Sequence, residues 1–306
     1  MRHVRTLGVS LLAVLALGAV VAGAAQAKQT LPEMGQCLPS EGGNTGKYAN
    51  SNCTVEVKKL GGVSEGPYEW TPEADNGEEM ETSGGFTFET ESGVKIECAA
   101  FGSSSFMRFL EHNGKTPLWR LNTCKSAANE KCSTPSVGSA KDVIGNSLEW
   151  KEEEGRGWNP TLGFIEGKKT TSPVVGLSFK GTKQTGEVEG EVGYERLFPP
   201  IVCATYNEEG EPVGGLGSVW IGGDNEKDYK GQNGVIGVLS PVDQMTKTYT
   251  LTYGSHNGEQ AVASFEKKKP QYLEAYFNNH WERVAFNAQI TFQMEGEAGI
   301  EIKARK

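Results

Sequence analysis

The most constraining feature of this sequence is a run of strict alternation near its C-terminus. From residue 284 to residue 294, apolar side chains occupy every second position, and most of the positions between them are polar. The apolar residues are Val284, Phe286, Ala288, Ile290, Phe292 and Met294. Successive side chains of a β-strand point to opposite faces of its sheet. The run therefore predicts a strand with one buried face and one solvent-facing side.

A second alternating stretch, Phe86–Ala100, carries a cysteine. It is typical of two short strands joined at Ser92-Gly93. In its second arm Cys98 shares its parity with the apolar residues Val94 and Ile96. The cysteine is therefore expected to point into the core, where a disulfide can tie this hairpin to another part of the fold.

Short alternating runs recur along the rest of the chain, and none shows a sustained helical spacing of apolar residues. Further strands are predicted over residues 105–110, 118–124, 143–150, 161–165, 173–180, 197–206, 213–221, 235–239, 245–253 and 300–304. Asn113-Gly114 is a favoured two-residue turn between the first two of these. We expect an all-β fold, an antiparallel β-sandwich, with barrel-like closure as the alternative.

The first 27 residues have the pattern of a signal peptide. A basic start with Arg2 and Arg5 precedes an apolar run over residues 7–21, and Ala25 and Ala27 form a small-x-small cleavage site. A membrane anchor is less favoured, because the run is shorter than the ~20 residues that a span needs. We expect a secreted protein, placed in the extracellular space or the cell envelope.

Three segments are expected along the chain. Residues 1–27 form the signal peptide, residues 28–76 a loop-rich lobe stapled by a disulfide, and residues 77–306 the main β-sandwich domain. The chain carries a formal net charge of −9, which disfavours nucleic acid as a partner. We expect no membrane insertion after cleavage and no cofactor. A cell-wall glycan or another extracellular polymer is the candidate partner.

All six cysteines lie after the signal peptide, and an even number in an exported chain indicates three disulfides. Six cysteines allow 15 pairings. Cys37 with Cys53 and Cys124 with Cys132 bracket short loops, which leaves Cys98 with Cys203 as a long-range pair. Because the cysteine spacings contain no C-x-x-C, a zinc site is not predicted.

These features resemble a known group of proteins. The shared marks are Cys37, Gly46-Lys47-Tyr48 and Cys53, then Tyr68-Glu69-Trp70, Val94–Cys98, Val235-Ile236-Gly237 before Met245, and Glu301–Ala304. The chain is similar in them to a group of uncharacterised secreted six-cysteine all-β proteins of high-GC actinobacteria. It departs from the group by a polar insertion over residues 222–234 and by Asp243-Gln244 before Met245. The resemblance implies the fold and export, and it implies no activity.

Tryptophan beside a carboxylate is the first candidate for a ligand site. Trp150 and Trp158 flank a charged loop, and Glu149 precedes Trp150. An indole offers a stacking face to a sugar, and a carboxylate offers hydrogen bonds or an acid. The structural alternative is that the tryptophans lie in the core and that the adjacency is accidental. A carbohydrate-active protein, either a glycan-binding module or a glycosidase, is therefore the alternative function.

A calcium site is the second candidate. Asp224, Glu226 and Asp228 place several carboxylates in one glycine-flanked loop, and Ca²⁺ takes six to eight oxygen ligands. The order of ligands is not that of an EF-hand, so a solvated acidic turn is the simpler interpretation. No nucleophile motif and no H-E-x-x-H is present in the sequence. We therefore expect a non-catalytic protein that binds a ligand or has a structural role.

Overall fold

A computed structural model describes the chain over fourteen segments. They are residues 31–58, 65–74, 80–102, 108–110, 113–115, 120–134, 142–145, 161–165, 173–179, 182–183, 195–196, 201–221, 232–294 and 299–304. Residues Leu31–Arg305 form one compact unit. Every named element within the described segments is a β-strand, and nearly all pairs are antiparallel, which confirms the predicted all-β class.

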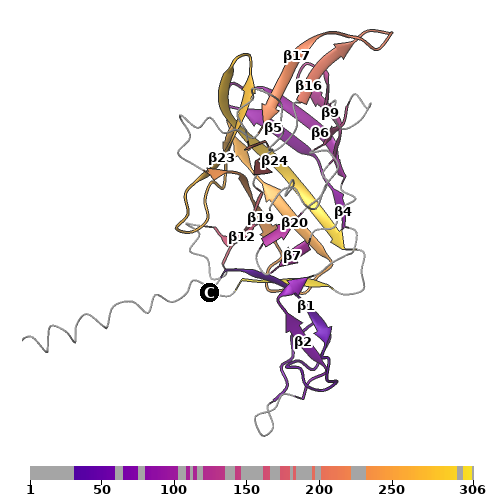
Figure 1. The fold of residues 1–306 in the computed structure, drawn as a ribbon, viewed down its shortest axis with the longest axis vertical. Helices are drawn as coiled ribbons and strands as arrows, with labels where there is room; N and C mark the ends of the chain where they lie inside the picture. The colour runs from indigo at the N-terminus through magenta and orange to yellow at the C-terminus, as the bar shows by residue number, and fades with distance from the viewer. Residues whose placement is uncertain are drawn as a thin grey trace, which may run out of the picture. The chain divides into compact units, whose positions relative to one another are not determined.

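The fold is organised around β24 (His280–Met294), the strand that the strict alternation predicted. On one side it pairs with β23 (Gln271–Phe277) and then with β20 (Thr248–Tyr253). On the other side it pairs with β5 (Phe86–Thr90) and then with β4 (Met80–Ser83). Strand β24 therefore joins β4 and β5, from residues 80–90, to β20 and β23, from residues 248–277 (Figure 1).

The alternating side chains of β24 supply the centre of the core. Phe286 and Ile290 are fully buried, whereas Asn287 and Gln289 between them are exposed. The ring of Phe286 lies 4.7 Å from that of Phe86 and 5.0 Å from that of Phe88, counted between centroids. These edge-on contacts are the arrangement that aromatic rings favour in a core.

The predicted hairpin at Phe86–Ala100 is confirmed. Strand β5 pairs with β6 (Lys95–Gly102), and Phe86 lies opposite Cys98. Gly93 has φ of 87° in the connecting turn, a conformation that glycine adopts without steric cost. As predicted, Ile96 and Cys98 are buried on the core side of β6.

Successive pairings continue from β6 and return to β23. They run through β9 (Arg120–Ser126), β10 (Lys131–Ser133), β16 (Ile201–Tyr206) and β17 (Pro212–Ile221). With β5, β23 and β24 they link eight strands in an unbroken ring of hydrogen-bonded pairs. The main core cluster draws side chains from every one of these strands.

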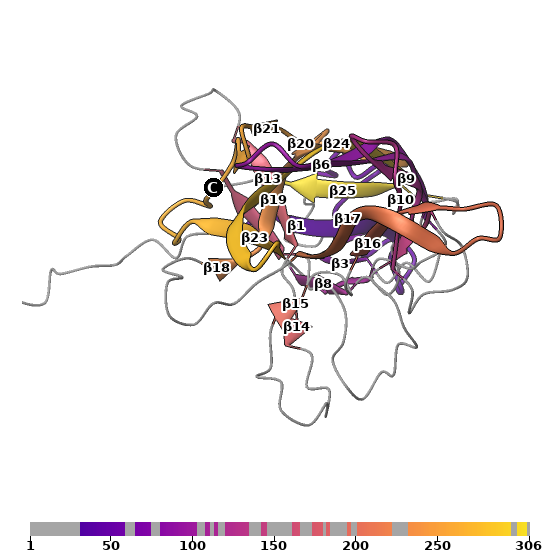
Figure 2. The same ribbon diagram turned by 90° about the horizontal axis from the view of Figure 1, so that it is seen from above.

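The hairpin of β16 and β17 continues past its neighbours. Figures 1 and 2 show it in orange, extending beyond the strands beside it. Its turn is closed by Gly210, which has φ of 83°, and by a hydrogen bond from Glu211 N to Asn207 Oδ1. Val213, in this extension, is 64% exposed.

Another part of the sheet is buried on both faces. Strands β12 (Thr161–Phe164), β13 (Val175–Phe179) and β19 (Val235–Ser240) pair side by side, and β19 continues to β20. All five residues of β13 are buried. Its outer face is covered by Phe265, which lies so close that a Cβ at Gly176 would be 3.0 Å from its ring. Strand β13 was predicted from its alternation, and it is buried on both sides because Phe265 packs onto its glycine.

The remaining strands of the framework are short. They are β3 (Glu73–Ala74), β7 (Arg108–Leu110), β8 (Asn113–Lys115), β11 (Ile144–Gly145), β14 (Thr182–Lys183), β15 (Glu195–Arg196) and β18 (Gln232–Asn233). The expected turn at Asn113-Gly114 is wrong, because both residues pair within β8 with Leu110 and Phe109.

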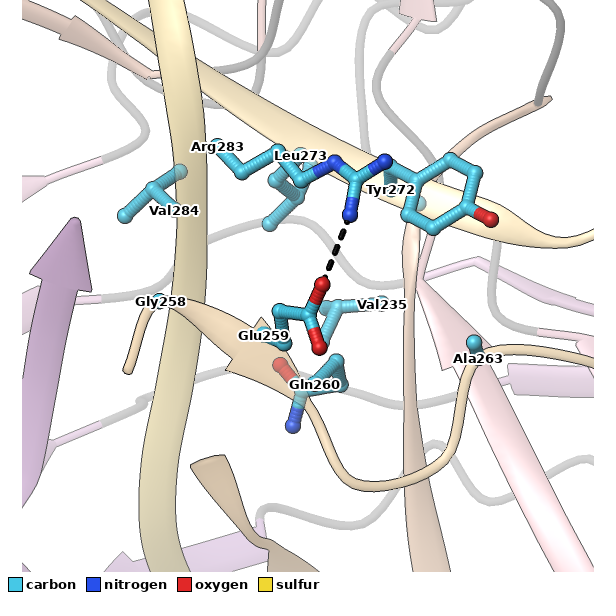
Figure 3. Close-up of a pocket in the computed structure, with 10 residues that line it drawn as sticks. Val235, Gly258, Glu259, Gln260, Ala263, Tyr272, Leu273, Arg283 and Val284 are labelled. Carbon is cyan, nitrogen blue, oxygen red and sulfur yellow. Dashed lines mark hydrogen bonds and ion pairs between the residues drawn. The ribbon is translucent and has the colours of Figure 1, made fainter. Parts of the chain in front are cut away.

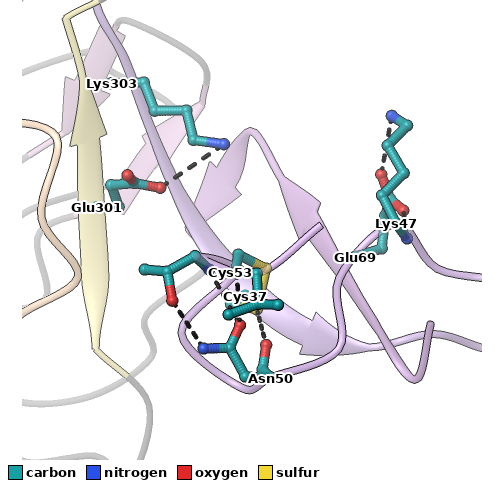
Figure 4. Close-up of a disulfide and its surroundings, with 9 residues drawn as sticks. Cys37, Lys47, Asn50, Cys53, Glu69, Glu301 and Lys303 are labelled. Carbon is teal, nitrogen blue, oxygen red and sulfur yellow. Dashed lines mark hydrogen bonds and ion pairs between the residues drawn. A yellow bond between two sulfur atoms is a disulfide. The ribbon is translucent and has the colours of Figure 1, made fainter. Parts of the chain in front are cut away.

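The segment expected to be loop-rich contains a strand. β1 (Glu33–Pro39) pairs with β2 (Tyr68–Thr71) and with the C-terminal strand β25 (Ile300–Lys303), so a small sheet joins the two ends of the described chain. In the chain between β1 and β2, Glu56 makes an isolated bridge with Tyr48. As predicted, the Cys37–Cys53 disulfide staples the loop beside this sheet (Figure 4).

The other two predicted disulfides are wrong. Cys98 bonds to Cys124 and Cys132 bonds to Cys203, instead of Cys98 to Cys203 and Cys124 to Cys132. Each bridge joins residues directly opposite each other on neighbouring strands, with Cα atoms 4.0 Å apart. Both disulfides therefore cross-link adjacent strands of the ring.

Candidate functional site

The candidate site is built on the hairpin of β23 and β24. Its turn is Asn278-Asn279, both with positive φ, which asparagine tolerates better than most residues. Strand β23 alternates regularly, with Gln271, Leu273, Ala275 and Phe277 buried and the residues between them half-buried. This strand is not among those predicted from the sequence, although the same period of two is present in it.

The outward positions of this hairpin carry aromatic and charged side chains. Tyr272, Glu274 and Tyr276 lie on β23, and Trp281 and Arg283 lie opposite on β24. We call these five residues the β23–β24 strip. All five are half-buried, which leaves part of each side chain open to solvent.

One end of the strip is aromatic. Tyr276 pairs with Trp281, and their ring centroids are 5.1 Å apart. On the other side of β23, Trp220 of β17 is the backbone partner of Tyr276. Tyr276 and Trp281 therefore form an aromatic pair at this end of the strip.

Arg283 occupies the other end of the strip. Its guanidinium lies 4.8 Å from the centre of the Tyr272 ring, within the range of a cation–π contact. Its Nη1 donates to Glu259 Oε1 at 2.9 Å, and its Nε lies 3.8 Å from Glu91 Oε1. The positive charge of Arg283 is therefore balanced by two carboxylates.

A pocket of about 190 Å³ opens beside Arg283. Tyr272, Arg283 and Glu259 supply its polar wall, and Val235, Leu273 and Val284 supply apolar surface. Figure 3 shows Arg283 and Glu259 pointing toward each other, with Tyr272 at the end of the guanidinium. The pocket combines an aromatic ring with hydrogen-bond donors and acceptors, which is typical of small-ligand sites.

The pocket wall opposite β24 is a small two-stranded hairpin, β21 (Ser255–His256) with β22 (Glu259–Gln260). Gln260 fastens it to β24: its Oε1 accepts from Phe286 N, and its Nε2 donates to Phe286 O. A Cβ at Gly258 would lie 2.4 Å from Glu91 N, so glycine permits a close backbone approach there. These contacts hold Glu259 in place against Arg283.

The ligand-site residues singled out in the sequence are not among those that the structure describes. Trp150, Trp158 and Glu149, the predicted sugar site, are outside the described residues. The same is true of the calcium candidates Asp224, Glu226 and Asp228, and of the cleavage-site residues Ala25 and Ala27. Those hypotheses remain predictions.

A serine, a carboxylate and a histidine come together at the end of β24, but not as a catalytic triad. Ser92 Oγ donates to Glu282 Oε1 at 2.8 Å, and His280 Nε2 lies 3.9 Å from Glu282 Oε2. Glu282 thus stands between the other two, whereas a nucleophilic serine needs the histidine as its direct base. Glu282 also accepts from Ser92 N, so its role is to hold the turn after β5.

In the part of the chain that the structure describes, no three histidine, cysteine or acidic side chains cluster as metal ligands would. No helix there is long and apolar enough to cross a membrane. The polar and aromatic groups around Arg283 are thus the strongest candidate for binding a ligand.

Comparison with protein-family models, with curated proteins and with solved structures finds no match to this chain.

Proposed function

We propose that the chain is an exported, non-catalytic protein that binds a ligand in the extracellular space or the cell envelope. The observation that carries the proposal is the pocket beside Arg283. Its charged side chains are partly exposed and anchored by neighbouring strands, so they present a preformed set of hydrogen-bonding groups. Preformed groups bind with a smaller loss of conformational entropy.

Export is supported by the cysteines and by the leader. The three disulfides use all six cysteines, and disulfides persist in oxidising compartments outside the cytosol. The signal-peptide pattern of residues 1–27 and the resemblance to secreted six-cysteine proteins agree with this location. Fractionation of expressing cells tests it: the processed protein should appear in the medium or the envelope, and a cytosolic, unprocessed chain would contradict it.

Binding is tested by a thermal-shift screen of the oxidised protein against glycans, free sugars, amino acids, small anions and Ca²⁺. A ligand that binds only the folded state raises its melting temperature by mass action. An active compound should lose its effect in the Arg283→Met variant and retain it in Lys95→Met, which removes a comparable exposed ion pair with Glu89. A compound that acts equally on both variants would place binding elsewhere.

The sequence also suggested a carbohydrate-active protein, either a glycan-binding module or a glycosidase. The aromatic residues of the β23–β24 strip favour the glycan-binding module. In its catalytic form, a glycosidase needs two carboxyl groups on either side of the scissile bond. At the pocket, Glu259 and Glu91 both contact the same guanidinium. We therefore place the binding function ahead of hydrolysis.

A further inference from the structure

We infer that the ligand of the pocket is a polysaccharide, with one sugar ring in the pocket and the chain continuing along the β23–β24 strip to Trp281. This inference rests on the proposed binding function and names its ligand class. Four properties of the site lead to it: the size of the pocket, the hydrogen-bonding chemistry of its wall, its balanced charge, and the length of the strip.

The size of the pocket fits one six-membered ring. Its volume is about 190 Å³, and a cavity of about 150 Å³ in another protein holds a benzene molecule. The additional volume leaves room for hydroxyl substituents. Drug-sized ligands take pockets of about 300–1,000 Å³, so this pocket admits a single ring unit of a larger ligand.

The chemistry of the wall fits hydroxyl groups. A hydroxyl both donates and accepts hydrogen bonds, a guanidinium only donates, and a carboxylate only accepts. Arg283 Nη1 and Glu259 Oε1 lie 2.9 Å apart, so neighbouring hydroxyls on one ring can reach one donor and one acceptor. The aromatic ring of Tyr272 offers a face to the C–H groups of a sugar, and the nearly buried side chains of Val235 and Val284 complete the lining of the pocket.

The charge balance disfavours a simple anion. Two carboxylates, Glu259 and Glu91, lie within ion-pair distance of Arg283. An anionic ligand would have to displace at least one of them, and it would approach a chain of net charge −9. A neutral, hydroxyl-rich ligand does not have to displace a carboxylate from Arg283, and the negative charge of the chain does not repel it.

The strip is longer than one ring. Tyr272 and Tyr276 are four residues apart on β23, which is about 13 Å at a strand rise of about 3.3 Å per residue. A six-membered ring built from bonds of about 1.5 Å cannot reach both. A ligand that contacts Tyr272 in the pocket and the Tyr276–Trp281 pair must therefore be a chain of sugar units.

The test is a titration of the oxidised protein with β-linked glucose and N-acetylglucosamine, from the monosaccharide to long oligomers, followed by calorimetry. We expect affinity to increase about tenfold or more with chain length, which is the effect of about one additional aromatic contact. Trp281→Ala should remove the gain from length, and Glu259→Gln should weaken the binding of every oligomer.

Tyr206→Ala and Glu69→Gln are the matched controls. They change a half-buried tyrosine of β16 and an ion-paired carboxylate of β2, both outside the strip, and they should leave binding unchanged. Affinity independent of length, or insensitive to Trp281→Ala, would overturn the inference. Pocket-dependent binding of a compound that is not a sugar would also overturn it and leave the proposed function standing. If no compound of any class binds, both fail.

Discussion

Lys303 Nζ lies 3.8 Å from the centre of the Trp70 ring. Lys303 is on β25 and Trp70 on β2, so the contact reaches across β1, which separates these strands. Glu301 Oε2 is 3.6 Å from the same nitrogen, and the Lys303 side chain is only 9% exposed. A largely desolvated cation over an indole is a favourable contact, and here it connects the outer strands of the small sheet.

Replacing Lys303 with methionine should lower the free energy of unfolding by about 1–2 kcal/mol, because it removes the cation–π contact and leaves Glu301 without its ion-pair partner. Urea titration measures the change. Lys47→Met is the control: Lys47 pairs with Glu69 at the surface, where such a pair contributes little. Equal effects of the two substitutions would contradict the assigned role of Lys303.

Loss of the Cys132–Cys203 disulfide should destabilise the protein more than loss of Cys37–Cys53. The bridged residues are 71 and 16 positions apart. In the chain-entropy model these closures contribute about 4 and about 3 kcal/mol. Denaturant midpoints of the two double cysteine-to-alanine variants test the order.

Peptide mapping of the oxidised protein provides the control for this comparison. It should recover Cys98 with Cys124 and Cys132 with Cys203. Recovery of a Cys98–Cys203 peptide would contradict the assigned pairing.

Tyr253→Phe should leave stability unchanged or raise it by up to about 1 kcal/mol. Tyr253 is 1% exposed, and its hydroxyl has no hydrogen-bond partner among the described residues. A buried hydroxyl without a partner is costly, and phenylalanine keeps the ring contact with Phe286. Tyr249→Phe is the contrast, since the Tyr249 hydroxyl donates to Ile300 O. Tyr249→Phe should lower the free energy of unfolding by about 1 kcal/mol. A larger decrease for Tyr253→Phe than for Tyr249→Phe would contradict this account.

Stability should fall above about pH 10. Burial raises the pKa of Tyr249, and Glu301 raises it further. Burial alone raises the pKa of Tyr253 well above its ordinary value. Tyrosines in the unfolded chain ionise near pH 10, so the folded state then binds more protons than the unfolded state. The stabilisation is complete below pH 10 and is lost as the pH rises toward the raised pKa values.

The measurement is the free energy of unfolding from pH 8 to pH 11. Each tyrosine contributes a slope of up to about 1.4 kcal/mol per pH unit above pH 10. The double variant Tyr249→Phe/Tyr253→Phe should show a flatter dependence than the unmodified protein. Identical slopes would show that other groups control alkaline stability.

The alternation of apolar and polar residues predicted individual strands and a hairpin between neighbouring strands. Val284–Met294 and Phe86–Ala100 became β24 and the β5–β6 hairpin, because burial of one face requires a period of two. The same signal was present in Gln271–Phe277 and was overlooked, which is why the candidate site was missed.

The disulfide pairing could not be obtained in this way. Cys98 lies opposite Cys124, Cys132 lies opposite Cys203, and the pairing of Lys125 with Lys131 brings Cys124 and Cys132 to adjacent positions of one row. In such a row only neighbouring cysteines are close enough to bond, so the one set of bridges that uses all four is Cys98 with Cys124 and Cys132 with Cys203. The choice depends on strand register and side-chain direction, which the spacing of cysteines does not contain.

The pocket was unpredictable for a related reason. Arg283 and Tyr272 come from one hairpin, but Glu259 and Val235 reach them only through contacts between distant segments. Glu259 belongs to none of the motifs noted in the sequence, and the Val235-Ile236-Gly237 motif implies no ligand site. Their positions depend on contacts outside these local hairpins: Val235 is placed by the pairing of β19 with β13, and β22 is held to β24 by the hydrogen bonds of Gln260 with Phe286.

The pairing of β1 with β25 has a consequence for biogenesis. β1 is the first described strand to be synthesised, and β25 is the last. The small sheet therefore cannot form until residues 300–303 have left the ribosome, and contacts this distant in sequence form slowly. Until then β1 has an unpaired edge, the kind of surface on which chains aggregate. The small sheet should accordingly be among the last parts of the described fold to form.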